Sequence, residues 1–391
     1  MDNNSSRRNF IATGLALPVA GLASASLPSI PAPSLPAAAQ QGNALSFRTI
    51  GKTGLKVTSV GFGCMITSDQ SVVEKGLDLG ITYFDTARGY QQGNNERMVG
   101  AALKSKRKSI VLSSKTQAPN KQAALDHLDT SLKELGTDYL DIWHLHAKSS
   151  IAQVTDDLID AQQTAKKAGK IRFAGVSTHQ NQATLIPAIV QKGMHDVILV
   201  AYNYTMAADL TEAINAAHKT GMGIIGMKVM AGGSRGGGGR GAAAQPAAPK
   251  PPGAGLAALK WVLSNPNVDT TIPSMTDMDQ LEENLKAMAQ PLTDSDKKLL
   301  TARLESIGPL YCRGCGICEG TCAQGLPVPE VLRYVMYAED YGQFALGREH
   351  FKQLPAELAA VRCGDCPTCT VNCPNGVRVS SRLTRAQEVF A

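Results

Sequence analysis

The sequence ITYFDTARGY, from Ile81 to Tyr90, joins an apolar run to a terminal carboxylate, Asp85, and places a tyrosine one short turn beyond it. The next two apolar runs also end on a titratable side chain, because SIVLSSK ends at Lys115 and LDIWHLH ends at His146. Neighbouring parallel strands lie about 4.8 Å apart, so in such strands Asp85, Lys115 and His146 would line up along one rim, with Tyr90 folding back over them. The pattern predicts a catalytic group of four side chains, with a chance set of hydrated strand ends as the alternative.

Strand-like runs rich in Val, Ile and Leu alternate with helical patterns along the chain. The runs are residues 60–65, 81–85, 110–115, 140–146, 171–177, 197–203, 223–230 and 269–273. Helical patterns with polar starts and glycine stops lie between them, as at 121–135 and 154–168. Repeated strand–helix units predict an α/β fold, a (β/α)8 TIM barrel, whose chemistry lies at the carboxyl ends of the strands. A doubly wound open sheet is the alternative, but GFGCM at 61–65 does not match its usual GxGxxG turn. Residues 47–58, with glycines in the middle, predict a short hairpin in front of the barrel.

The predicted organisation has a targeting segment at 1–39, a barrel at 46–292 and a helical domain at 293–391. A low-complexity stretch, GGSRGGGGRGAAAQPAAPKPPGAG at 232–255, interrupts the barrel directly after its seventh strand. Such a composition is typical of a flexible loop. The functional alternative is a lid in which Arg235, Arg240 and glycine N–H groups close over a pyrophosphate.

The N-terminal segment carries SRRNFI at 6–11, which is a twin-arginine pattern, followed by a weakly apolar run rich in Gly and Ala. Small residues at 23–25 or 37–39 are candidate cleavage sites. The alternative is a disordered basic terminus with a chance Arg-Arg pair. The pattern predicts export to the periplasm or another extracytoplasmic space by a route that carries proteins already folded and loaded with cofactors.

Composition narrows the class of protein. Hydrophobic residues make up 43% of the chain and charged residues 18%, which suits one large packed domain with an appendage. The net charge of +6 is spread along the chain, and no run of Lys and Arg is interleaved with aromatic residues, so a nucleic-acid partner is not expected. The body of the chain contains no apolar run long enough to span a bilayer, so the mature protein is not expected to be membrane-spanning.

Eight of the nine cysteines form two runs of the pattern CxxCxxCxxxC. The ligand positions are Cys312, Cys315, Cys318 and Cys322 in the first run and Cys363, Cys366, Cys369 and Cys373 in the second. This spacing lets four thiolates hold a [4Fe–4S] cluster, and in two-cluster proteins the fourth cysteine of each run ligates the other cluster. We therefore predict two [4Fe–4S] clusters in a helical, ferredoxin-like domain. Zinc sites and disulfides are the alternatives, and Cys64 is interpreted as a buried core thiol.

Several motifs resemble those of the aldo/keto reductase family, across about residues 47–288. They are, in order, FRTIGKTGLKVTSVGFG, FDTARGY with NNERMVG after it, LDIWHLH, GKIRFAGVS and IPSMTDMDQLEEN. The resemblance implies a barrel with a bound nicotinamide cofactor, NADP or NAD, and hydride transfer between a carbonyl compound and its alcohol. Together with the cysteine runs, the chain resembles the ferredoxin-bearing branch of that family.

By position, the catalytic tetrad of the family corresponds to Asp85, Tyr90, Lys115 and His146. Carbonyl reduction needs a proton for the developing alkoxide, and a free phenol has a pKa near 10. The resemblance implies that Tyr90 donates this proton, that the Lys115 ammonium lowers the phenol's pKa, and that Asp85 holds the lysine in place. His146 would orient the carbonyl oxygen or assist the proton relay.

The resemblance also implies cofactor contacts at Ser177, Thr178, Ser274, Gln280, Glu283 and Asn284. Ser177 matches a serine that binds the carboxamide, and Thr178 stands where asparagine is usual. Glu283 and Asn284 match adenine contacts. Ser274 and Gln280 replace part of the usual Lys/Ser/Arg set around a 2′-phosphate, which favours guanidinium or ammonium partners. NADP and NAD therefore both remain candidates.

Two functions follow from these patterns. The first is an exported oxidoreductase that interconverts a small carbonyl compound and its alcohol, with clusters that are either an electron conduit to a redox partner protein or a structural element. The second is an electron-transfer or redox-sensing module whose barrel binds a nicotinamide or a partner without reducing a carbonyl group.

Overall fold

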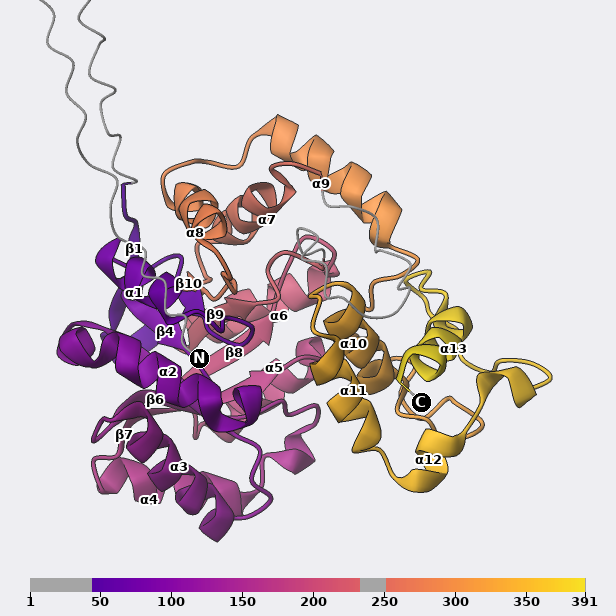
Figure 1. The fold of residues 1–391 in the computed structure, drawn as a ribbon, viewed down its shortest axis with the longest axis horizontal. Coiled ribbons are helices and arrows are strands. Elements are labelled where there is room, and N and C mark those ends of the chain that lie inside the picture. The colour runs from indigo at the N-terminus through magenta and orange to yellow at the C-terminus, as the bar shows by residue number, and fades with distance from the viewer. Residues whose placement is uncertain (1–43, 233–250, 391) are drawn as a thin grey trace, which may run out of the picture. The chain divides into compact units, whose positions relative to one another are not determined.

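The computed structural model describes residues 44–232 and 251–390. Eight strands form a parallel sheet in the order β10-β9-β8-β7-β6-β5-β4-β3. The strands are β3 (Phe62–Gly63), β4 (Tyr83–Asp85), β5 (Val111–Thr116), β6 (Leu140–Leu145), β7 (Ile171–Thr178), β8 (Val197–Ala201), β9 (Gly223–Met227) and β10 (Thr270–Thr271). Parallel bridges from Val60 to Thr271 and from Gly63 to Ser274 join the two edges. The predicted (β/α)8 barrel is therefore confirmed (Figure 1).

Most residues of the barrel strands are buried, as their apolar runs require, although Arg172 of β7 is exposed and Phe173 is half-buried. All six residues of β5 and all six of β6 are buried. Pairing places Asp85 opposite Ser113 and Lys115 opposite His144. The carboxyl ends of β4, β5 and β6 therefore lie side by side, which is the arrangement that the strand-end pattern predicted.

Helices cover the outside of the barrel (Figure 1). They are α1 (Gln70–Asp78), α2 (Asn94–Leu103), α3 (Lys121–Leu135), α4 (Asp156–Lys167), α5 (Gln182–Lys192), α6 (Ala208–Lys219), α7 (Ala254–Leu263) and α8 (Met278–Leu285). Helix α3 shows why these segments are helical. The Asn120 side chain accepts a hydrogen bond from Ala123 N at the start, and Gly136 ends the helix with φ of 62°, a conformation that glycine adopts without strain.

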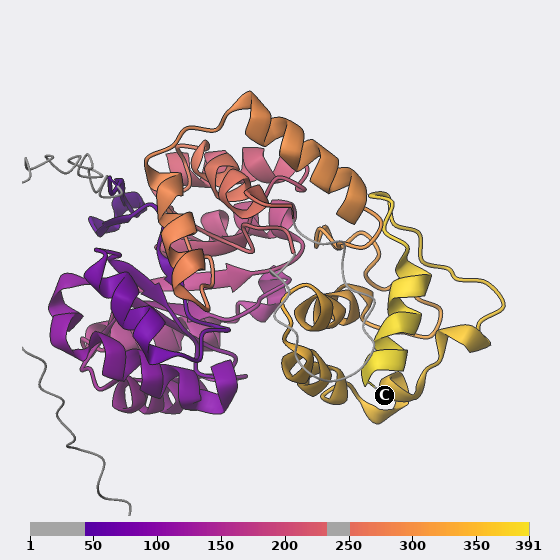
Figure 2. The same cartoon turned by 45° about the horizontal axis from the view of Figure 1, so that its top comes forward.

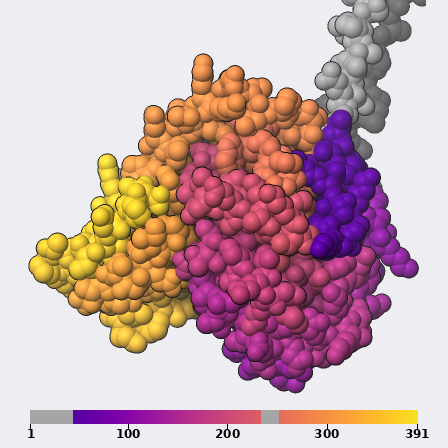
Figure 3. All heavy atoms as spheres, turned by 180° about the vertical axis from the view of Figure 1, so that it is seen from behind, coloured from indigo at the N-terminus to yellow at the C-terminus, as the bar shows by residue number. Residues whose placement is uncertain are grey.

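The hairpin of β1 (Phe47–Thr49) and β2 (Lys56–Thr58) closes the amino-terminal end of the barrel. Its turn is tied to the start of β9, because Lys52 N donates to Gly221 O at 2.8 Å. The hairpin is thus at the end of the barrel opposite to the carboxyl ends of the strands. In the view of Figure 3 its indigo residues lie against those of the barrel.

Five helices follow the barrel units (Figure 2). They are α9 (Asp294–Ile307), α10 (Val328–Glu339), α11 (Phe344–Lys352), α12 (Ala356–Ala360) and α13 (Val379–Phe390). Helix α9 begins with a capping box between Thr293 and Asp296, and its Leu300 packs with Ala257 and Ala258 of α7. This helix therefore shares a core with the barrel, and the division of the chain at residues 292 and 293 stays a prediction.

Helices α10, α11 and α13 share a separate apolar core. Val328, Leu383 and Phe390 are among its fully buried members. Within the two described ranges, no helix is long and apolar enough to cross a membrane. The predicted twin-arginine segment and most of the predicted loop at 232–255 lie outside the described residues.

Candidate active site

A buried ion pair forms the floor of the site. Lys115 Nζ pairs with Asp85 Oδ1, and each side chain is only 1% exposed. Ser113 Oγ donates to the second carboxylate oxygen of Asp85 at 2.5 Å, and Lys115 Nζ also donates to Thr86 O at 2.7 Å. A buried charge needs such partners to offset its lost hydration. The ammonium and the carboxylate are thus held at the ends of β4 and β5.

Tyr90 reaches this ion pair from the 3₁₀ turn that it begins, Tyr90–Gly93. Its hydroxyl oxygen accepts a hydrogen bond from Lys115 Nζ at 3.3 Å, and the ammonium lies 4.8 Å from the centre of its ring. The turn is fixed by Arg88 N, which donates to Lys115 O at 3.1 Å, and by Gln91, whose side chain donates to Met65 O and Thr67 O. Gln91 has φ of 50°, a strained conformation of the kind that gathers at functional sites.

His146 completes the predicted tetrad. It follows β6 directly, and its backbone N donates to Thr116 O at 2.8 Å. Its ring lies edge-on to Tyr90, with 5.8 Å between the ring centres and 79° between the ring planes. The structure therefore brings together the acid, the phenol, the amine and the imidazole that the sequence pattern singled out.

Burial decides the charge states of these groups. Burial lowers the pKa of Lys115, but Asp85 and Tyr90 raise it by more, so the lysine stays an ammonium. Burial raises the pKa of Tyr90 to about 12, and Lys115 only partly counteracts this effect. The expectation that the lysine lowers the phenol's pKa is therefore wrong for the net value, because desolvation of the phenolate outweighs the neighbouring charge. Burial also lowers the pKa of His146 well below its usual value, so its ring is neutral near pH 7.

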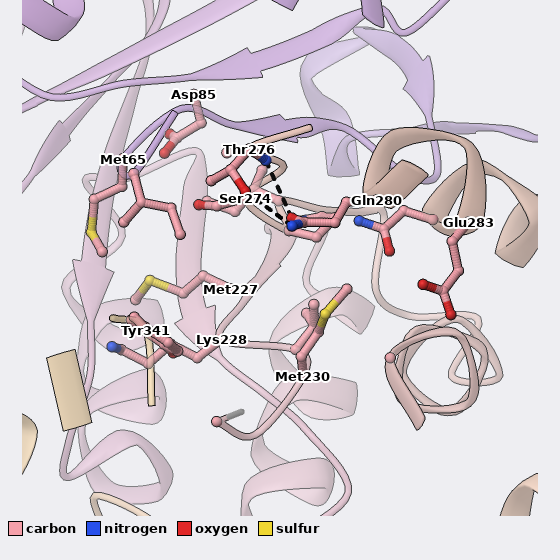
Figure 4. Close-up of a pocket in the computed structure, with 18 of the residues that line it drawn as sticks. Met65, Asp85, Met227, Lys228, Met230, Ser274, Thr276, Gln280, Glu283 and Tyr341 are labelled. Carbon is pink, nitrogen blue, oxygen red and sulfur yellow. Dashed lines mark hydrogen bonds between the residues drawn. The ribbon is translucent and has the colours of Figure 1, made fainter. Parts of the chain in front are cut away.

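A cavity of about 270 Å³ opens beside the tetrad. Asp85 lines one part of it (Figure 4), and Tyr90 is also a lining residue. Four of the predicted cofactor residues line another part, namely Ser274, Gln280, Glu283 and Asn284. Gln280 is held in place because its side-chain amide donates to Thr276 Oγ1 at 2.9 Å and to Asp277 Oδ2 at 2.6 Å. The catalytic and cofactor predictions thus meet in one cavity.

Ser177 and Thr178 do not line this cavity. Both are fully buried at the end of β7. Ser177 Oγ accepts a hydrogen bond from Ala147 N at 2.8 Å, and Thr178 Oγ1 donates to Gln180 O at 2.9 Å. In this structure Ser177 supports the backbone next to His146 and Thr178 supports that of Gln180, and their contact with a cofactor stays a prediction.

Three further residues of the cavity wall were missed, namely His179, Lys228 and Tyr341. His179 and Lys228 directly follow β7 and β9, so the signal that found Asp85 and Lys115, a titratable residue at a strand end, was available for them too. Tyr341 comes from the segment between α10 and α11 and had no comparable signal.

The eight clustered cysteines are all free thiols and form two mixed sets. Burial raises the pKa of Cys312 to about 12, and the pKa is raised further by Cys318, Cys315 and Cys373. Burial also raises the pKa of Cys363, and the neighbouring thiols of Cys322, Cys366 and Cys369 raise it further. The fourth cysteine of each run therefore lies with the first three of the other run. This arrangement fits two clusters with exchanged fourth ligands.

Backbone and side-chain N–H groups point at the thiols of the first set. Gly314 N donates to Cys312 Sγ at 3.4 Å, and Asn375 Nδ2 donates to Cys315 Sγ at 3.5 Å. Hydrogen bonds to sulfur tune cluster potentials. In the part of the chain that the structure describes, no three His, Cys, Asp or Glu side chains are placed to hold a single metal ion.

Sequence comparison identifies the family. The Aldo/keto reductase family model matches residues 67–253 and 248–305, which is more than half of the chain. The chain belongs to the aldo/keto reductase family. The model of a 4Fe-4S dicluster domain matches residues 311–378, so this aldo/keto reductase carries an iron–sulfur domain behind its barrel. The predicted enzyme class, an NAD(P)-dependent oxidoreductase, is confirmed at the level of the family.

Several aldo/keto reductases and oxidoreductases resemble the barrel. L-galactose dehydrogenase of Arabidopsis thaliana is 28% identical over 283 residues, which cover 63% of this chain and 89% of that protein. The uncharacterized oxidoreductase YqkF of Bacillus subtilis is 32% identical over 148 residues, so the chain spans about half, 48%, of its length. The holo form of aldo-keto reductase AKR11C1 from Bacillus halodurans superimposes with a TM-score of 0.55 at 26% identity, over 66% of this chain and 96% of that one.

Breaking the Asp85–Lys115 ion pair of this aldo/keto reductase is expected to lower the stability of the protein strongly. Lys115→Met leaves the Asp85 carboxylate buried without its charge partner, so we expect a loss of about 3–5 kcal/mol in the free energy of unfolding. Thermal denaturation followed by circular dichroism would measure it. The double variant Asp85→Asn/Lys115→Met removes both charges and should recover most of the loss. Equal melting temperatures for wild type and Lys115→Met would contradict the buried pair.

Proposed function

We propose that this protein interconverts a small carbonyl compound and its alcohol by hydride transfer. The observation that carries the proposal is the contact of 3.3 Å between the Tyr90 hydroxyl and the Lys115 ammonium at the wall of a cavity. A proton donor, a fixed positive charge and a neutral imidazole are what carbonyl reduction needs from a protein.

The chain's own residues have separate roles in this proposal. A reduced nicotinamide, when bound, would supply a hydride for the carbonyl carbon. Tyr90 gives its proton to the carbonyl oxygen, and the Lys115 ammonium stabilises the phenolate left behind. His146 is neutral and orients the carbonyl oxygen through its ring nitrogen. Asp85 keeps Lys115 charged and in position.

The residues lining the cavity fit a nicotinamide cofactor in general. Ser274, Gln280, Glu283 and Asn284 offer hydroxyl, amide and carboxylate groups to a ribose and an adenine. Comparing NADH and NADPH in the assay below assigns the preferred cofactor.

The proposal is tested with the holoprotein purified without oxygen. Oxidation of NADH and of NADPH is followed with a range of small aldehydes and sugars, and product alcohols are identified by mass spectrometry. Stoichiometric formation of alcohol supports the proposal. Cofactor binding without alcohol formation from any of these compounds would contradict it.

The charge states predict the pH dependence of the reaction. The protonated phenol, the form needed for reduction, is fully present below the Tyr90 pKa of about 12 and is lost as pH rises through it. His146 is neutral above its lowered pKa. Because kcat/KM reports ionisations of the free enzyme, we expect it to stay flat between about pH 7 and about pH 10. An alkaline loss of rate beginning near neutral pH would contradict this assignment.

For the clusters, we propose that Cys312, Cys315, Cys318 and Cys373 hold one [4Fe–4S] cluster and that Cys322, Cys363, Cys366 and Cys369 hold a second. Cys312 lines a small cavity together with His179 and Lys228, which also line the main cavity. This position favours a second candidate function, electron transfer between a redox partner protein and a nicotinamide held in the barrel. Cofactor binding without alcohol formation, combined with reduction of the clusters, would favour that function.

Export by the twin-arginine route is also proposed, on the SRRNFI pattern at 6–11. Cell fractionation of a bacterium expressing the full chain would test it, with Arg7→Lys/Arg8→Lys as the matched variant. Equal amounts of both proteins in the periplasm would overturn the assignment.

A further inference from the structure

Lys228 places its amine at one end of the main cavity. Its backbone is strained, with φ of 53°, and its side chain runs toward Tyr341, whereas Gln280 and Glu283 lie at the other end (Figure 4). Lys228 Nζ is 4.7 Å from the ring centre of Tyr337 and 5.2 Å from that of Tyr341. Two aromatic faces stabilise a cation, but burial and the nearby Arg333 lower the pKa of Lys228 well below its usual value, against the attraction of Asp340. An anion bound beside this amine would favour its charged form.

His179 and Lys228 line both the main cavity and a small cavity beside it, and Arg333 from α10 lines the small one. Arg333 donates to Gln180 Oε1 at 3.4 Å and also hydrogen-bonds with the side chains of Tyr337 and Tyr334, so these described partners are all neutral. His179 Nδ1 is buried without a hydrogen-bond partner among the described residues. The ring of His179 lies 6.3 Å from that of His146, which places this group at the tetrad end.

The acidic groups nearby do not form ion pairs with these side chains. Burial raises the pKa of Asp340 to about 6, so it is a carboxylate near pH 7, but Arg382 and Arg303 share its attraction with Lys228. Glu330 accepts a hydrogen bond from Gln180 Nε2 at 2.6 Å. Among the described residues, no carboxylate lies within ion-pair distance of Lys228 or Arg333. Basic side chains that are half-buried, as Lys228 and Arg333 are, normally have an anionic partner. Because neither has one among the described residues, this end of the cavity is suited to bind an anion.

We propose that the carbonyl or alcohol substrate carries a carboxylate, which binds between Lys228 and Arg333 on a wall supplied by the cluster-bearing domain. This inference rests on the proposed function and names its substrate class. Because α10 and the segment after it provide Arg333, Tyr337 and Tyr341, the appended domain selects the substrate as well as carrying the clusters. The reacting carbonyl would then face Tyr90 and His146.

The other source of an anion is the pyrophosphate of the cofactor. Lys228 reaches away from Ser274 and Gln280, the predicted cofactor end, and toward Tyr341, which follows α10 (Figure 4). The position favours the substrate, and the experiment separates the two sources.

The test uses two aldehydes of nearly equal shape, 4-formylbenzoate and its neutral methyl ester. The ratio of their kcat/KM values is measured with the cluster-loaded holoprotein for wild type, Lys228→Met and Lys228→Arg. Loss of a charged hydrogen-bond partner should lower the preference for the carboxylate by about tenfold to a hundredfold in Lys228→Met. Lys228→Arg keeps the charge and should retain most of the preference. Lys219→Met removes an exposed lysine at the end of α6 and should change neither rate.

Binding is measured in parallel, by calorimetry of both compounds and of the nicotinamide cofactors. If Lys228→Met weakens only the carboxylate compound, the inference holds even where no turnover occurs, and the proposed reaction alone fails. If the variant weakens the cofactor and leaves the ratio of the two aldehydes unchanged, Lys228 serves the pyrophosphate and the inference is overturned. Equal preference for ester and carboxylate in the wild type also overturns it.

Discussion

Tyr90→Phe is expected to lower kcat/KM for carbonyl reduction by about 10²–10⁴-fold, the range that a positioned general acid contributes. The substitution removes only the hydroxyl, whose oxygen accepts from Lys115 at 3.3 Å. The ring, its contact with His146 and the cavity wall remain. Steady-state kinetics with a saturating reduced cofactor would measure the loss, and fluorescence titration should show cofactor binding within about twofold of wild type.

Tyr139→Phe is the matched control. This tyrosine precedes β6 at the amino-terminal end of the barrel and stacks on Arg107, 4.1 Å from the guanidinium to the ring centre. It should leave the kinetics unchanged. Equal rates for wild type and Tyr90→Phe would remove the phenol from the reaction and leave the tetrad without a proton donor.

Cys373→Ala is expected to remove or convert the cluster of the first run rather than that of its own run. Cys373 lies beside Cys312, Cys315 and Cys318, so its loss opens one iron of that set. Iron analysis should show that up to about half of the metal is lost. Electron paramagnetic resonance of the reduced protein should give the same remaining signal as Cys315→Ala.

The complementary pair supplies the control. Cys322→Ala should match Cys366→Ala, because Cys322 lies with the second run, and Cys64→Ala should keep both signals. A spectrum of Cys373→Ala that matches Cys366→Ala would show that each run binds its own cluster.

Local sequence patterns were sufficient to predict the barrel and the tetrad. The ends of β4, β5 and β6 are marked by Asp85, Lys115 and His146, and parallel pairing alone brings strand ends to one rim. The hairpin turn and helix α3 could also be predicted from the sequence, because turn glycines and helix-capping residues determine the structure of only a few neighbouring residues.

Properties that depend on how distant segments pack together could not be predicted from local sequence patterns. The pKa of Tyr90 depends on how much water the surrounding chain excludes, so the charge of Lys115 suggested the wrong net direction. Tyr341 reaches the main cavity, and Arg333 the small cavity beside it, only because α10 and the following segment lie against the barrel residues His179 and Lys228. The hydrophobic periodicity of α10 predicts a buried face, but it does not predict that the helix packs against the barrel. Ser177 and Thr178 match a cofactor motif in sequence, yet their hydroxyls are used by neighbouring backbone groups.

Transfer of deuterium from the cofactor tests the central claim most directly. The holoprotein is supplied with reduced nicotinamide carrying deuterium at both C4 positions, together with an aldehyde that it turns over. Hydride transfer beside Tyr90 and Lys115 predicts one deuterium on the carbinol carbon of every product molecule, as measured by mass spectrometry. Alcohol whose newly added hydrogen on that carbon comes from the solvent, or alcohol that forms from chemically reduced clusters without any nicotinamide, would contradict the account.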